Sequence, residues 1–153
     1  MAEGSILERI QGDMAPAMKA KDADTLSTLR MLKAALMEAK TKKPREAVLS
    51  SDEEVEVLQR YVKKRRETIE ELQKAGRADL VAREEQEIAV TRRYLPQMMS
   101  EDDLRSLVKQ TVEKLGAAGP KAMGQVMGVV MAQVKGRAEG GTVSRLVKEA
   151  LGG

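Results

Sequence analysis

The stretch YLPQMMSEDDL, residues 94–104, separates two kinds of helical sequence. Pro96 cannot continue a helix arriving from its N-terminal side, because proline lacks a backbone N–H and its ring clashes with the preceding turn. Ser100 is a typical residue to cap the start of a new helix. Beyond Pro96 the expected helices shorten, glycine becomes more frequent and charge falls. The sequence therefore predicts two helical modules, residues 1–95 and 96–153.

The composition indicates an all-α protein. The 153 residues include no Phe and no Trp, and 33% of them are charged. A core must therefore be built from Leu, Val, Ile, Met and Ala, and a chain rich in Glu, Lys, Ala and Leu favours helices. We expect helices throughout and no strand.

The missing residue types restrict the chemistry. The chain has no Cys and no His, which excludes thiol nucleophiles, imidazole bases and the usual zinc and haem ligands. It contains no Walker-type phosphate loop and no kinase signature. We therefore expect no metal, no cofactor and no catalysis by this chain on its own. Apolar runs near the roughly 18 residues of a membrane span are absent, as is a secretory signal, so a cytoplasmic location is expected.

Helix start and stop signals predict four helices before Pro96. These signals are a capping box at Ser5 and Glu8, a start near Asp24, a break at Pro44, a second box at Ser51 and Glu54, a stop at Gly76, and a polar helix from Asp79 to Tyr94. The arrangement indicates an elongated antiparallel bundle.

Two details of this bundle are unusual. Pro16 interrupts the first helical pattern and is expected to kink that helix, shorten it or split off its last turn. The fourth helix is so polar that only a narrow apolar seam, formed by Leu80, Ile88 and Leu95, is expected to hold it.

The residues after Pro96 predict a compact three-helix module. Ser100 is expected to cap the first helix and Gly116 to end it. The Gly119–Pro120 pair is expected to start the second helix, because proline suits the first helical turn. Thr142 is expected to cap the third helix.

The stretch MGQVMGVVM, residues 123–131, combines an apolar stripe with two glycines. Gly124 and Gly128 lie four residues apart, beside a face formed by Met123, Met127 and Val130. Each glycine inside a helix costs about 1 kcal/mol relative to alanine, so a close contact should offset that cost. We expect packing against a neighbouring helix of the module, and the alternative is close approach of a binding partner.

The loop KGRAEGG, residues 135–141, is a candidate phosphate site. Exposed amides at a helix start, with cations nearby, can hold a phosphate, although a simple turn between helices explains the same residues. From residue 119 onward the chain has five Lys or Arg and two Glu, which accounts for the whole net charge of +3. The nucleic-acid-binding candidates are Lys135, Gly136, Arg137, Gly140, Gly141, Arg145 and Lys148.

A second basic cluster lies in the long third helix. Its members are Lys63, Lys64, Arg65 and Arg66. They surround the helix and can pair with glutamates four residues away, so a solvated, self-paired helix is the alternative to a binding surface. Because no aromatic residues are interleaved with these cations, stacking on single-stranded bases is not expected.

Several stretches together resemble the YqeY family. They are STLRMLKAAL at 27–36, YLP at 94–96, MGQVMGVVM at 123–131, KGRAEGG at 135–141 and VSRLVKEAL at 143–151. The resemblance covers nearly the whole chain in order. In the loop, Glu139 stands where members of the family commonly have aspartate.

The resemblance implies a link to tRNA. The YqeY family shares its C-terminal module with the tail of the B subunit of the tRNA-dependent amidotransferase, a glutamine-dependent carbon–nitrogen ligase, and that tail is implicated in holding tRNA. It implies a non-catalytic accessory protein that binds tRNA or a tRNA-handling enzyme. Two alternatives remain, a protein-interaction scaffold without an RNA role and a helper subunit in amide transfer.

Overall fold

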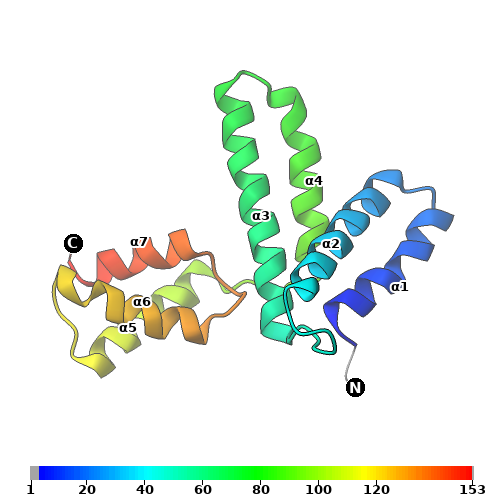
Figure 1. The fold of residues 1–153 in the computed structure, drawn as a ribbon. Coiled ribbons are helices and arrows are strands. Elements are labelled where there is room, and N and C mark those ends of the chain that lie inside the picture. Colours follow the sequence, from blue (N-terminus) through cyan, green and yellow to red (C-terminus); the bar gives the residue numbers. More distant parts are fainter. Residues whose placement is uncertain (1–3, 153) are drawn as a thin grey trace. The chain divides into compact units, whose positions relative to one another are not determined.

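The computed structural model describes residues 4–152, and these contain helices and connecting segments but no strand (Figure 1). The all-α prediction is thus confirmed for the described residues. The chain divides into two compact units between Leu95 and Pro96, which is where the sequence texture changes. We call residues up to Leu95 the N-terminal unit and residues from Pro96 the C-terminal unit.

The N-terminal unit consists of two helical hairpins that share one core (Figure 1). Helix α1 (Ile6–Lys19) pairs with α2 (Ala23–Thr41), and α3 (Ser51–Lys74) pairs with α4 (Val81–Arg92), which follows a short 3₁₀ turn, η1 (Ala78–Leu80). Helix α2 also contacts α3 and α4, so it connects the hairpins. The most deeply buried side chains here are Ile10, Leu29, Leu32, Leu36, Leu58 and Val90.

Pro16 neither shortens the first helix nor splits off its last turn, so these two expectations are wrong, and the expected kink stays a prediction. Helix α1 continues through Pro16 to Lys19. The turn after the proline remains hydrogen-bonded, because the Ala20 N–H donates to the Pro16 carbonyl at 2.9 Å. Ala17 is buried in the core, so packing holds the turn in place although the proline itself can donate no backbone hydrogen bond.

The capping box of the third helix lies one residue earlier than expected. Ser50 is the cap and Glu53 completes the box, so the prediction of Ser51 and Glu54 is wrong. Two consecutive serines and two consecutive glutamates allow either register, and tertiary contacts decide between them. The Glu54 carboxylate is buried and accepts the N–H of Ile6 at 3.1 Å and of Leu7 at 2.9 Å. Glu54 therefore caps the start of α1 from a different helix.

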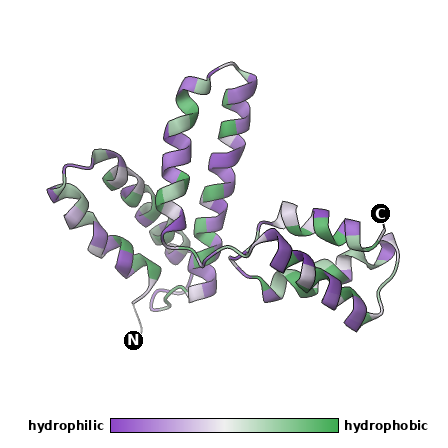
Figure 2. Ribbon diagram, turned by 180° about the vertical axis from the view of Figure 1, so that it is seen from behind, coloured by the Kyte–Doolittle hydropathy of each residue, from purple (hydrophilic) through white to green (hydrophobic). Residues whose placement is uncertain are grey.

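The apolar seam of α4 differs from the expected one. Val81, Val90 and Tyr94 are buried, whereas Leu80 is 42% exposed. Leu80 belongs to the 3₁₀ turn before α4, where the side-chain period is three residues instead of 3.6. The expected seam is therefore wrong at Leu80. Most residues of α3 and α4 are hydrophilic, with hydrophobic residues at intervals (Figure 2).

The C-terminal unit is formed by three helices that all contact one another: α5 (Glu101–Leu115), α6 (Met123–Gln133) and α7 (Gly140–Ala150). As expected, Ser100 caps α5 and Gly116 ends it in a left-handed conformation. The Gly119–Pro120 pair starts a short 3₁₀ turn, η2 (Pro120–Ala122), and α6 itself begins later than expected, at Met123. The buried core consists of Leu104, Val108, Val126, Val130, Val134, Ala138, Val143, Leu146 and Val147.

Thr142 is not the cap of the last helix. Helix α7 begins two residues earlier, at Gly140, and Glu139 occupies the cap position in an extended conformation. Ala138 is buried, which fixes the chain in the core just before the helix starts. Gly140 and Gly141 therefore form the first turn of α7 and are not part of the preceding loop.

Candidate functional site

The two glycines of α6 face solvent, so the expected contact with a neighbouring helix of the module is wrong. Gly124 and Gly128 are exposed, and a Cβ atom added at either position would meet no other group within 4 Å. The reason is the orientation of the helix. Val126 and Val130 are fully buried against the rest of the unit, which turns the glycine strip outward.

The outward face of α6 is also free of charge. No residue from Met123 to Gln133 is charged, in a chain with 33% charged residues. Ala132 is exposed on the same helix as the glycines. Gln125 and Gln133 are exposed as well. The exposed side of α6 is therefore neutral and is formed by small residues at Gly124, Gly128 and Ala132. The cost of its glycines is not offset by packing within the described chain.

The α6–α7 loop brings several of the expected site residues together. Gly136 is buried with φ 75°, a conformation that favours glycine. Lys135 and Arg137, on either side of it, are exposed, as are Gly140 and Gly141. The loop therefore presents two cations close in sequence to the glycine-rich first turn of α7.

Arg137 has a structural role that the sequence did not reveal. Its Nε donates a hydrogen bond to the Gln97 carbonyl at 3.1 Å. Its own carbonyl accepts the Met99 N–H at 2.8 Å. Arg137 thus binds the segment that leads into α5, which lies about forty residues earlier in the chain.

Arg145 is engaged in ion pairs between α5 and α7. Its guanidinium donates to the Glu101 carboxylate and, at 3.3 Å, to Glu149. The Arg145 hydrogen bond lowers the pKa of Glu101 below its usual range. Arg105 of α5 contacts the same two glutamates, at 3.9 Å and 3.7 Å. The candidate Arg145 therefore contributes to helix pairing, whereas Lys148 is exposed in the last turn of α7, away from the loop.

In the second basic cluster, too, one residue forms ion pairs within the protein and the others are exposed. Arg65 pairs with Glu84 at 3.3 Å and Glu87 at 3.6 Å, and its guanidinium lies 5.2 Å from the centre of the Tyr61 ring. Its partners lie on α4, so the expected pairing within one helix missed this contact. The remaining candidates, Lys63, Lys64 and Arg66, are exposed on α3.

Burial changes the acidity of the groups around Arg65. The Tyr61 hydroxyl donates to Glu87 at 3.3 Å, and burial, reinforced by the negative charge of Glu87, raises the pKa of Tyr61 to about 12. Burial also raises the pKa of Glu84, against the opposing effect of Arg65. These groups join α3 to α4, and the geometry is that of a structural ion pair.

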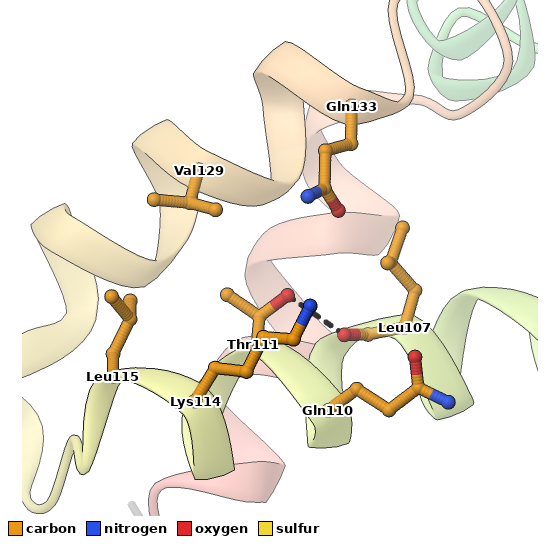
Figure 3. Close-up of a pocket in the computed structure, with 7 residues that line it drawn as sticks. All are labelled: Leu107, Gln110, Thr111, Lys114, Leu115, Val129 and Gln133. Atoms are coloured by element: carbon orange, nitrogen blue, oxygen red, sulfur yellow. Dashed lines mark hydrogen bonds between the residues drawn. The ribbon is translucent and has the colours of Figure 1, made fainter.

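A shallow hollow of about 120 Å³ lies between α5 and α6 (Figure 3). It is lined by Leu107, Gln110, Thr111, Lys114, Leu115, Val129 and Gln133. The Thr111 hydroxyl donates to the Leu107 carbonyl at 2.8 Å. Lys114 is the one titratable side chain among the lining residues, so the hollow has no acid–base pair for catalysis.

Residues 4–152 also offer neither a metal site nor a membrane span. Within this part of the chain, no group of three or more Asp or Glu side chains is arranged to hold a metal ion. None of the helices described combines the length and the apolar character needed to cross a membrane.

Comparisons with known proteins agree with the resemblance. The family model described as Yqey-like protein matches residues 7–151. The chain is 33% identical over 154 residues to "Altered inheritance of mitochondria protein 41, mitochondrial" of Pyrenophora tritici-repentis, covering 98% of this chain and 83% of the relative. It is 34% identical over 92 residues to an uncharacterized protein of Schizosaccharomyces pombe, covering 60% of this chain and 72% of that protein. The first name places that relative in mitochondria, and the cytoplasmic location expected for this chain stays a prediction.

Proposed function

Because the chain belongs to the Yqey-like protein family, we propose that it is a non-catalytic accessory protein that binds tRNA through its C-terminal unit. The resemblance of this unit to the tail of the amidotransferase B subunit supports the choice of tRNA. The amidotransferase chemistry itself is not included, because the chain has no Walker-type loop and no kinase signature.

The exposed glycine strip of α6 is the observation that carries the proposal. Gly124 and Gly128 leave open space above the helix, so the backbone of a ligand can approach the helix backbone closely. A neutral face formed by small residues suits recognition of RNA by shape and sugar–phosphate backbone, and such recognition needs no base-reading side chains.

Exposed cations beside this strip supply the attraction for phosphate. Lys135 and Arg137 lie just beyond the C-terminal end of α6, and Lys121 precedes its start. Arg137 Nε is bound to Gln97, but a guanidinium has further N–H groups that can donate to a phosphate. A substitution of Lys135 leaves the hydrogen bonds between Arg137 and residues 97–99 in place, so Lys135 is the cation to test.

A protein-interaction scaffold is the second candidate function, and the neutrality of α6 favours it. Protein interfaces are depleted of charge at their centres, and α6 has no charged residue. A helper role in amide transfer would use the same surface to contact the enzyme that performs the reaction. Salt dependence distinguishes RNA from these protein partners.

The experiment is a titration of the full chain with unmodified tRNA at several salt concentrations, followed by fluorescence anisotropy. We expect association at low ionic strength that weakens with salt. Lys135→Glu should weaken binding and make the slope of log affinity against log salt shallower by about one counterion. Lys74→Glu, a matched charge change at an exposed position of the N-terminal unit outside both candidate clusters, should leave the slope unchanged. Absence of salt-dependent association would refute the tRNA proposal and leave the scaffold.

A further inference from the structure

The segment after Pro96 is held firmly by the C-terminal unit. The Gln97 carbonyl accepts a hydrogen bond from Arg137 Nε at 3.1 Å, and the Met99 N–H donates to the Arg137 carbonyl at 2.8 Å. Met99 also packs against the core of the unit. Arg137 takes part in both hydrogen bonds, as the donor in one and the acceptor in the other. We call this pair of hydrogen bonds, which holds residues 97–99 just before α5 begins, the clamp.

The segment before Pro96 is held just as firmly by the N-terminal unit. Tyr94 is 5% exposed, its hydroxyl donates to Asp13 Oδ2 at 2.5 Å, and the Arg9 guanidinium lies 5.3 Å from its ring centre. Arg9 also donates to the Arg93 carbonyl at 3.3 Å. The Leu95 N–H donates to the Arg92 carbonyl at 3.2 Å, and the Leu95 side chain packs against the core of this unit. The chain is therefore anchored to the first unit as far as Leu95.

We propose that Arg137 is a positioning residue that makes residues 97–99 part of the C-terminal unit and so confines the joint between the units to Leu95 and Pro96. Proline restricts its own φ and the conformation of the residue before it, so few backbone torsions remain for the joint. Without the clamp, the mobile stretch would extend from Leu95 to the Ser100 cap.

Arg137 is also one of the candidate phosphate-binding residues. If the proposed tRNA binding is correct, the loop that contacts phosphate is also the loop that fixes the joint. A ligand that immobilises the Arg137 side chain then also restricts the joint. The clamp itself needs no ligand, so it is tested without one.

The test is hydrogen exchange of the Met99 amide in the full chain, in wild type and in Arg137→Met. Methionine keeps an unbranched stem but has no N–H donor. We expect Met99 exchange to become about tenfold faster in the variant, since a hydrogen bond to a charged group is lost from the clamp. Proteinase K should also cleave between residues 95 and 100 faster than in wild type.

Two references make the result decisive. Lys109→Met, a matched change of an exposed cation on α5, should leave Met99 exchange at the wild-type rate. The buried amides of Val108, Val130 and Val147 report whether the unit is still folded. The proposal is overturned if Met99 is unprotected in wild type, if Arg137→Met leaves it unchanged, or if its exchange rises only together with that of the three core amides.

Discussion

The two units are both helical but place their charged groups differently. In the N-terminal unit charged side chains lie between helices: Glu54 caps α1 from α3, and Arg65 pairs with two glutamates of α4. In the C-terminal unit the helices meet through aliphatic side chains, and the pairs formed by Arg145 lie at the exposed edge, with about half of each side chain accessible. Charges in the first unit fix the fold, whereas the second unit leaves a neutral helix face open to a partner.

The largest expected effect tests whether the units are stable independently. Leu36→Ala removes a fully buried side chain from the N-terminal core and should destabilise that unit by about 2–5 kcal/mol. The C-terminal unit, which has its own core, should keep its stability, as followed by hydrogen exchange of Val130 and Val147. A matching loss of protection in both units would show that they unfold as one, and the comparison would fail.

The next effect concerns the buried carboxylate between hairpins. Glu54→Ala leaves the N–H groups of Ile6 and Leu7 without their acceptor, and we expect a loss of about 1–3 kcal/mol in urea unfolding of the N-terminal unit. Glu56→Ala, at an exposed position of the same helix, is the control and should change stability little. Equal effects of the two substitutions would contradict the capping role of Glu54.

A smaller change in stability, of opposite sign, is expected for a substitution in α6. Gly128→Ala adds a methyl group in open space and should stabilise the C-terminal unit by about 0.5–1 kcal/mol, because glycine is less favourable than alanine inside a helix. Urea unfolding monitored by the core amides of this unit measures the change. Destabilisation would mean that the glycine is needed for packing within the chain.

The smallest effect appears at alkaline pH, because Tyr61 is only partly buried. Its pKa is raised from 10.0 to about 12, so its neutral form contributes stability fully below pH 10, and that contribution is lost as the pH rises toward 12. Both tyrosines lie in the N-terminal unit. We expect tyrosinate absorbance to rise as the pH approaches 12, together with a loss of helix in this unit. In Tyr61→Phe both changes should be smaller. Ionisation at the ordinary pKa with the fold intact would contradict this expectation.

Local sequence signals predicted most of the fold. Ser100 and Gly116 act locally, through the backbone they cap or end, and the structure agrees at both positions. The predictions are wrong where the bounds of a helix depend on contacts with other parts of the chain. The register of the capping box depends on the partner that Glu54 finds on α1, and the start of α7 depends on burial of Ala138.

The candidate site was less predictable than the fold. The sequence identified the glycine strip and the loop cations but not the side of α6 that faces solvent. Met123, Met127 and Val130 define an apolar face with the glycines beside it, and only the packing shows that the glycine side faces solvent and not another helix. Gln97, which binds Arg137, and Glu101, which binds Arg145, are about forty residues distant in sequence, so no local spacing rule could have found these two contacts.

The most direct measurement for the central claim compares Gly128→Leu with Ser106→Leu, a leucine placed at an exposed position of α5. Each variant is examined for urea stability and for tRNA affinity. If the glycine strip contacts RNA, Gly128→Leu is at least as stable as wild type, because leucine is more favourable than glycine inside a helix, and it loses at least about tenfold in affinity, equivalent to about 1.4 kcal/mol. Ser106→Leu retains both its stability and its affinity. Wild-type affinity in a folded Gly128→Leu variant would contradict the account.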